Sequence, residues 1–352
     1  MVERWRELGE WLRPRVGATG KVEASGLGGP AAIGYSAETT VFRVTYDSAR
    51  GRVERRLVLR SEVPDPAIYP LQTPGIDVDI EIQHRVMVSI ARSSNVPVAP
   101  ILGYEPDPSV IGTPFFVMDF VEGDVPAVQP PYSASGFFAD ARPEQRSRMI
   151  SSGLEVLAEV HRINWRSAGL QWLLPSGEQP TLARQLAIWE RCGREALGDR
   201  RHEAMETAAE LLHRQLPKGS EPCLCWGDAR PGNIIWRDWK CVSVTDWEAA
   251  AIAPPESDLG WWLMFDRTMH EGAGLARLPG DLTREEQLAI YEKAAGRRVE
   301  DLRLHEIFAA YRYCVIVVQI ANRLVKRGIL PTQNQFWSDN PIVNTLRDLL
   351  SS

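Results

Sequence analysis

The chain has 352 residues and a mass of 39.5 kDa, which is enough for two domains or for one two-lobed unit with a large core. Its hydrophobic content of 44% and charged content of 24% are those of an ordinary globular protein rather than a disordered or fibrous one. The formal net charge of −6 argues against nucleic acid as a partner, because phosphate backbones attract basic surfaces.

The first residues and the cysteines indicate the compartment. Trp5, Leu8 and Leu12 stand at helical spacing among charges, so the N-terminus does not read as a signal peptide. No window approaches the ~18 uninterrupted apolar residues of a membrane span. The cysteines lack metal-ligand spacing and are interpreted as buried free thiols of a reducing compartment: Cys192, Cys223, Cys225, Cys241 and Cys314. We expect a soluble, cytoplasmic protein with no membrane partner, and the oligomeric state stays open.

The first part of the chain reads as an antiparallel meander. Residues 21–27, 40–46 and 55–61 alternate as strands do, and a loop of small residues at 34–39 precedes the second of them. Glycine in such a loop lets the main chain approach a phosphate closely. By itself the loop is a weak signal, since it lacks the lysine of a Walker A motif and a plain loop is the more frequent case.

The rest of the chain changes from mixed to helical character. A helix is predicted over residues 77–92, and a strand is predicted at 115–121 after a turn at 105–108. Further on, apolar periodicity predicts helices over residues 143–164, 182–197, 202–216, 258–265, 282–296 and 301–327. We therefore predict an α+β fold with a β-rich lobe at 1–123, a Pro-, Ala- and Ser-rich connector at 124–136 and a helical lobe at 137–352.

Three polar side chains stand out inside the helical part. Asp228, Asn233 and Asp246 lie beside short apolar strands at 234–236 and 242–244, which would mount them on a hairpin. Phosphoryl transfer needs one carboxylate to orient the attacking hydroxyl, and amide and carboxylate oxygens to hold Mg²⁺ against nucleotide phosphates. We assign the first role to Asp228 and the metal to Asn233 and Asp246.

Two neighbours extend this set. Arg230 could neutralise the transferring phosphoryl group, and Glu248 could hold a second metal or brace the loop, because it lies on the same side of an extended chain as Asp246. A Gly–Asp pair by itself is usually only a turn. The spacing of the carboxylate, the amide and the second carboxylate around apolar strands favours a functional site.

The motif at 227–235, GDARPGNII, resembles the His–Gly–Asp catalytic loop of the aminoglycoside phosphotransferase and choline kinase family of small-molecule kinases. Residues 245–248 resemble its metal-binding segment, and 258–261 resemble the motif that buttresses the loop. The stretch from Pro255 into the Trp-rich helix is more similar to the branch associated with acyl-CoA dehydrogenases, which weakens an antibiotic-resistance interpretation. The resemblance covers residues 20–330.

The resemblance implies a two-lobed protein-kinase-like fold whose N-lobe binds the nucleotide. It places nucleotide contacts in the small-residue loop, on one strand and at the hinge: Gly34, Ser36, Ala37, Arg60, Asp119, Phe120 and Val121. Arg60 stands where the family usually has lysine, and its helix partner is either Glu81 or Gln83, with Glu81 preferred for its charge. Trp226 stands where most relatives have histidine, at a position that chiefly supports the loop.

The activity implied is ATP- and Mg²⁺-dependent transfer of the γ-phosphoryl group to a hydroxyl of a small molecule. The acceptor stays open among aminoglycosides, macrolides, choline-like amines, sugars and hydroxyacyl-CoAs, and the candidate contacts are Asp266, His270, Glu271, Tyr311, Arg312 and Gln319. Two other functions stay open. One is a nucleotide-binding pseudokinase, motivated by Trp226 and Arg60, and the other is a non-enzymatic interaction module.

Overall fold

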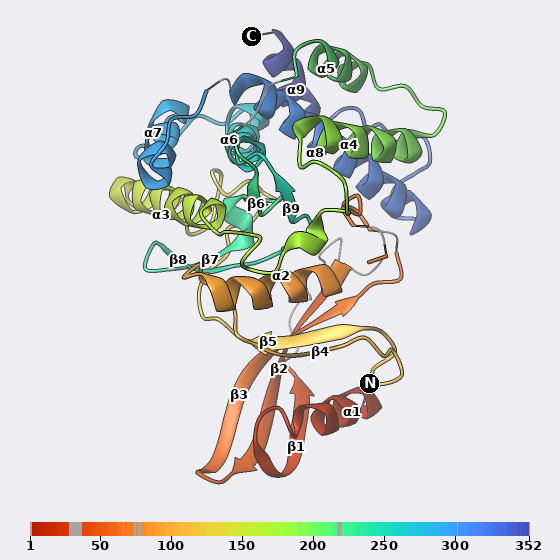
Figure 1. Cartoon of the computed structure of the whole chain (residues 1–352), viewed down its shortest axis with the longest axis vertical. Coiled ribbons are helices and arrows are strands. Elements are labelled where there is room, and N and C mark those ends of the chain that lie inside the picture. Colours follow the sequence, from red (N-terminus) through yellow and green to blue (C-terminus); the bar gives the residue numbers. More distant parts are fainter. Residues whose placement is uncertain are drawn as a thin grey trace.

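The computed structural model describes residues 2–27, 37–65, 67–73, 75–76, 79–216, 220–300 and 302–351. A sheet-containing lobe and a larger helical lobe are stacked along the long axis of the molecule (Figure 1). The sequence therefore predicted the α+β class correctly. The predicted nucleotide contacts Gly34 and Ser36 lie outside the described residues, and the boundaries drawn at 124–136 stay a prediction.

Within the described ranges, the N-lobe contains one five-stranded antiparallel sheet. Its strands pair in the order β1 (Ala18–Gly26), β2 (Ala37–Ser48), β3 (Gly51–Glu62), β5 (Phe115–Asp119) and β4 (Ile101–Glu105). Alternation along β2 and β3 buries Phe42 against Leu57, which are paired across the hairpin. The inner face of the sheet is apolar as a result.

Two helices accompany this sheet. Helix α1 (Val2–Leu12) packs on β1, and α2 (Asp79–Ser93) lies between the sheet and the helical lobe (Figure 1). Along α2, Ile80, Met87 and Ile90 are buried at helical spacing. This helix therefore presents one fixed face to β3, on which the candidate site depends.

The helical lobe is built around two buried helices, α6 (Glu256–Met269) and α8 (Leu302–Lys326), which pack on each other. The surrounding helices are α3 (Pro143–His161), α4 (Leu182–Leu197), α5 (Glu203–Arg214), α7 (Arg284–Ala295) and α9 (Pro341–Ser351). By length and composition α8 could cross a membrane. However, 83% of its most apolar window is buried within the protein, which is typical of a core helix.

Two small antiparallel sheets carry the central motif inside this lobe. Strand β6 (Cys223–Cys225) pairs with β9 (Ala251–Ala253), and β7 (Ile234–Arg237) pairs with β8 (Lys240–Val244). The second pair is the predicted hairpin. Short 3-10 turns occur at η1 (Gln171–Leu173), η2 (Pro231–Asn233) and η3 (Glu271–Ala273).

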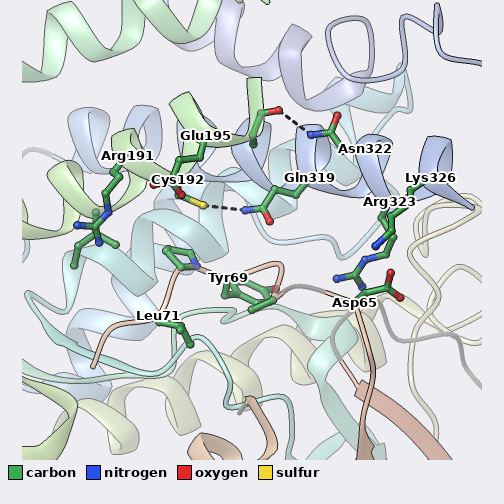
Figure 2. Close-up of a pocket in the computed structure, with 14 residues that line it drawn as sticks. Asp65, Tyr69, Leu71, Arg191, Cys192, Glu195, Gln319, Asn322, Arg323 and Lys326 are labelled. Carbon is green, nitrogen blue, oxygen red and sulfur yellow. Dashed lines mark hydrogen bonds between the residues drawn. The ribbon is translucent and has the colours of Figure 1, made fainter. Parts of the chain in front are cut away.

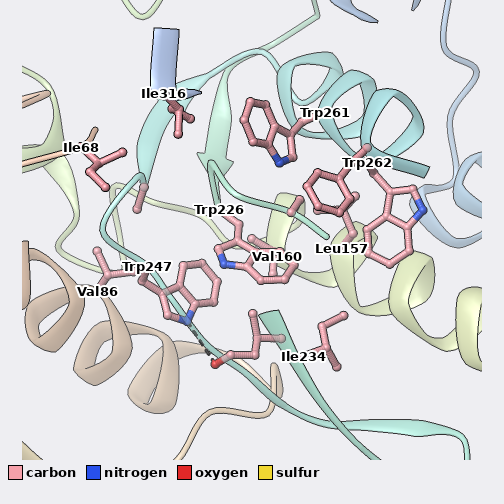
Figure 3. Packing of buried hydrophobic residues seen from close by; sticks show 14 of the residues in the cluster. Ile68, Val86, Leu157, Val160, Trp226, Ile234, Trp247, Trp261, Trp262 and Ile316 are labelled. Carbon is pink, nitrogen blue, oxygen red and sulfur yellow. Dashed lines mark hydrogen bonds between the residues drawn. The ribbon is translucent and has the colours of Figure 1, made fainter. Parts of the chain in front are cut away.

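Indole rings fill the core beneath these sheets. Trp226, Trp247, Trp261 and Trp262 are at most 1% exposed and gather between the hairpin, α3 and α6 (Figure 3). Such large side chains hold the backbone around them in a single arrangement, because interiors pack without voids. The cysteines, all within the described chain, are free thiols as predicted, although Cys192 and Cys241 are only half-buried.

Candidate active site

Asp228 lies in the loop between β6 and η2, and its side chain is surrounded by donors. The Oδ2 atom accepts hydrogen bonds from Asn233 Nδ2 at 2.7 Å and from the Tyr69 hydroxyl at 2.9 Å. The Oδ1 atom accepts from the Trp261 indole N–H at 2.9 Å and from Arg230 Nε at 3.0 Å. The residue is 4% exposed. These hydrogen bonds replace the water that a buried carboxylate loses, and they fix the orientation of the Asp228 side chain.

Asp258 holds the backbone of this loop from below. Its carboxylate is fully buried and accepts the N–H of Trp226 at 2.5 Å and that of Gly227 at 2.8 Å. Gly227 has φ of +91°, and a Cβ there would lie 2.0 Å from the carbonyl oxygen of Ala249, so only glycine fits. From the other side, Arg312 donates to the carbonyl oxygen of Gly227 at 2.7 Å. The turn before Asp228 is thereby fixed on both sides.

Trp226 connects the loop to the segment that carries Asp246. Its indole N–H donates to the carbonyl oxygen of Thr245 at 2.8 Å, while Thr245 N–H donates to the carbonyl oxygen of Asn233 at 2.9 Å. Asp246 follows with φ of +57°, a left-handed conformation that non-glycine residues adopt only where the surroundings enforce it. The tryptophan therefore supplies a donor between the two polar segments.

Arg60, on β3, reaches from the sheet to the helical lobe. Its guanidinium donates to Gln83 Oε1 at 3.0 Å and to Asp246 Oδ1 at 2.8 Å. The preference for Glu81 as its partner is therefore wrong. Glu81 pairs with Arg85 on the outer side of α2, whereas Gln83 is 1% exposed and shares the buried helix face with Ile80 and Met87. Helical phase decides this contact, not formal charge.

The predicted metal-binding residues surround one cavity. Asn233, Asp246 and Glu248 line a space of about 550 Å³ together with Asp228 and Arg60. Asn233 uses its Nδ2 group on Asp228, which leaves its Oδ1 atom for another partner. Amide and carboxylate oxygens are the ligands that Mg²⁺ takes from proteins, so this donor set fits the ion. When bound, Mg²⁺ would offset the charge of nucleotide phosphates.

Arg230 lies in the same cavity with its guanidinium against Asp228 and over the ring of Phe265, 5.1 Å from the ring centroid. Burial alone would lower the pKa of Arg230, but the neighbouring charge of Asp228 raises the pKa above its usual value. The side chain is a permanent cation. Arg230 thus places a positive charge in the cavity beside Asp228, and its role toward a phosphoryl group stays a prediction.

The remaining predicted nucleotide contacts lie in the N-lobe sheet and in the residues that follow it. Ala37 is the first residue of β2 and is fully buried. Asp119 ends β5, where its N–H donates to the carbonyl oxygen of Pro100 at 2.9 Å and its carboxylate pairs with Arg55. Phe120 and Val121 follow, where the chain leaves the sheet for the helical lobe. Whether these residues contact a nucleotide stays a prediction.

A second cavity of about 520 Å³ adjoins the first, since Tyr69 lines both. Figure 2 shows this second cavity with Tyr69 in its wall. Its wall combines apolar and cationic side chains: Leu71, Ile188, Arg191, Arg323 and Lys326. Of the acceptor contacts suggested from sequence, Gln319 lines this cavity. Asp266 instead pairs with Arg277, and His270 pairs with Asp281, away from the cleft.

Three further residues complete the site, of which Tyr69 and Trp261 had no predicted role and Arg312 had a different one. Tyr69 and Trp261 both donate to Asp228, and Arg312 fixes Gly227 rather than an acceptor. The sequence offered a clue to Trp261, since this residue ends the motif at 258–261 that resembles the family's support for the catalytic loop. The sequence offered no clue to Tyr69, because this residue lies in an irregular segment more than 150 positions before Asp228.

Comparison with known proteins gives one consistent result. A family model described as the phosphotransferase enzyme family matches residues 30–300. The acyl-CoA dehydrogenase family member 11 of Pongo abelii is 29% identical over 254 residues, which is 68% of this chain and 30% of that protein. The chain therefore spans less than a third of that relative.

Solved structures show the same architecture. A protein from Ralstonia eutropha, described as a candidate aminoglycoside phosphotransferase, matches with a TM-score of 0.72 at 21% identity, covering 98% of this chain and 97% of that one. An aminoglycoside phosphotransferase in complex with GDP and kanamycin matches with a TM-score of 0.57 at 14% identity, covering 97% and 95%. These likenesses confirm the two-lobed, kinase-like fold.

Proposed function

Because this chain belongs to the phosphotransferase enzyme family, we propose that it transfers the γ-phosphoryl group of ATP, with Mg²⁺, to a hydroxyl group of a small molecule. The observation that carries this proposal is the convergence of Asp228, Asn233, Asp246 and Arg60 on one cavity between the lobes. The four residues come from three separate segments. A purely structural role would not require so many charged groups to line one space.

Each residue has a chemical task in this reaction. The acceptor oxygen attacks the γ-phosphorus, its proton passes to Asp228, and the bond to the bridging oxygen breaks to release ADP. Asn233 and Asp246 would hold Mg²⁺, and Glu248 would support that ion or hold a second one. Arg60 and Arg230 supply positive charge beside the phosphates. Catalysis here consists mainly of positioning and charge.

The charge of the second cavity bears on the acceptor. Arg191, Arg323 and Lys326 line it against two carboxylates, and one of these, Asp65, already pairs with Arg327. A polycationic acceptor such as an aminoglycoside would meet repulsion there. An acceptor with an anionic group is favoured, and the relatives named for acyl-CoA dehydrogenases make hydroxyacyl-CoAs the first class to test.

The test is a phosphorylation screen with ³²P-labelled ATP and, in parallel, labelled GTP, each with and without Mg²⁺. The acceptors are hydroxyacyl-CoAs, sugars, choline-like amines, macrolides and aminoglycosides. We expect labelled product with at least one acceptor, and we expect Asp228→Ala to lose turnover while it keeps nucleotide affinity. Equal turnover in Asp228→Ala would disprove the assignment of Asp228.

The same assays separate the two alternative functions. A pseudokinase would show a thermal shift with ATP and Mg²⁺ but no labelled product with any acceptor. An interaction module would show neither. Arg60 bonded to both Asp246 and Gln83 supports the enzyme, because the cation is held at the point where phosphates would enter.

A further inference from the structure

The Tyr69 hydroxyl is bonded to the residue proposed as the catalytic base. It donates to Asp228 Oδ2 at 2.9 Å, which is the distance at which an acceptor hydroxyl would have to donate its proton. Tyr69 belongs to the segment between β3 and α2, so it is an N-lobe residue that contacts the catalytic loop of the other lobe. The phenol thus takes one hydrogen-bonding position on Asp228 Oδ2, beside the one that Asn233 uses.

Contacts with the helical lobe hold this segment in place. Gln319, on α8, donates to the carbonyl oxygen of Ile68 at 2.9 Å, and Arg184, on α4, donates to that of Gln72 at 2.8 Å. The Tyr69 ring packs edge-on against Trp189 with centroids 6.4 Å apart. The hydroxyl is therefore directed at Asp228 by neighbours on both sides of it.

The ionisation and surroundings of Tyr69 define what it can do. Burial and the charge of Asp228 raise the pKa of Tyr69 well above its usual value, so the hydroxyl keeps its proton and acts as a donor. The ring also lines both cavities, so it stands where they adjoin. An acceptor that extends from the second cavity to Asp228 must pass this ring.

We propose that Tyr69 is a positioning residue. In the absence of acceptor its hydroxyl occupies the hydrogen-bonding position on Asp228 that the acceptor hydroxyl would take, and it thereby suppresses phosphoryl transfer to water. The inference rests on the proposed function. In the reaction that it suppresses, a water oxygen bonds to the γ-phosphorus, the bond to the bridging oxygen breaks, ADP leaves with that electron pair, and the water proton passes to Asp228. A true acceptor displaces the phenol hydroxyl, whereas the phenol outcompetes a single water because the protein already holds it in place.

The experiment measures ATP hydrolysis with Mg²⁺ and no acceptor. In Tyr69→Phe the ring still fills its space but Asp228 Oδ2 loses the phenol donor and keeps the one from Asn233, so we expect hydrolysis to rise roughly fivefold. A rise cannot come from partial unfolding, which only lowers activity. The matched control is Tyr46→Phe, which removes the hydroxyl of a buried tyrosine that bonds Arg55 instead. It should leave hydrolysis unchanged.

The double variant Tyr69→Phe/Asp228→Asn should lose the gain, because the proton no longer has an acceptor. If Tyr69→Phe hydrolyses ATP no faster than the wild type, while wild-type hydrolysis depends on Asp228, the role of Tyr69 is wrong and the proposed function stands. If neither protein binds or hydrolyses ATP, the proposed function fails and this inference fails with it.

Discussion

The indole N–H of Trp226 donates to the carbonyl oxygen of Thr245 at 2.8 Å, and this bond connects the loop that carries Asp228 with the segment that leads to Asp246. Histidine, the family's usual residue at this position, also presents a ring N–H. Tryptophan therefore keeps a donor and adds a large buried surface against Trp247, whose ring centroid lies 5.8 Å away. The substitution by itself is no reason to expect an inactive protein.

This bond can be tested by removing the donor and keeping a ring. In Trp226→Phe the carbonyl oxygens of Thr245 and Asp246 lose the indole N–H, and the smaller ring leaves a void. We expect the free energy of unfolding to fall by about 2–4 kcal/mol. Urea denaturation followed by fluorescence measures it. Trp239→Phe, a half-buried tryptophan in the β7–β8 turn, is the control and should cost clearly less.

The partner of Arg60 gives a second prediction. Gln83→Ala removes the bond that orients the guanidinium toward the cleft, so the KM for ATP should rise roughly fivefold with little change in stability. Glu81→Gln is the matched control on the same helix, since Glu81 pairs with Arg85. Steady-state kinetics at saturating acceptor measures both. If Glu81→Gln raised the KM more than Gln83→Ala does, Glu81 would be the partner of Arg60 after all.

The buried carboxylate of Asp258 gives a third. Asp258→Asn keeps the size but turns an amide group toward one of the N–H groups of Trp226 and Gly227, and it removes the charge that His161 faces at 3.2 Å. We expect a loss of about 2–4 kcal/mol in the free energy of unfolding, together with loss of turnover. The exposed Asp199→Asn should change neither. If Asp258→Asn were as stable as the wild type, Asp258 would not hold the loop through the N–H groups of Trp226 and Gly227.

His84 makes stability depend on pH. Burial lowers its pKa from 6.5 to about 4, and the cations Arg85 and Arg92 add to the effect. Between those two pH values the unfolded chain binds a proton at this residue and the folded chain does not, so acidification favours unfolding. In thermal melts from pH 7 to pH 4.5, the melting temperature should therefore fall less steeply for His84→Gln than for the wild type. Ser93→Ala, at an exposed residue of the same helix that does not titrate, should keep the wild-type slope.

Much of the fold follows from local pattern. Helix α4 spans Leu182–Leu197, the range predicted, because its apolar spacing and the Thr181 cap both act within a few residues. Helix α9 was not predicted although Ile342, Val343 and Leu346 are buried at helical spacing. Strand β9 was also missed, since three residues in an alanine-rich stretch carry no clear period.

The candidate site likewise has a part that could be predicted from the sequence and a part that could not. Asp228, Asn233 and Asp246 could be grouped from sequence because one hairpin carries them, and a hairpin is set by turns and alternation close along the chain. Three contacts could not be predicted from the sequence: that of Tyr69 with Asp228, that of Gln83 with Arg60 and that of Arg312 with Gly227. Local sequence pattern was therefore enough to identify which chemical groups the loop offers. Which other groups face the loop depends on the three-dimensional fold, because those contacts join segments that meet through packing between the lobes and around α8.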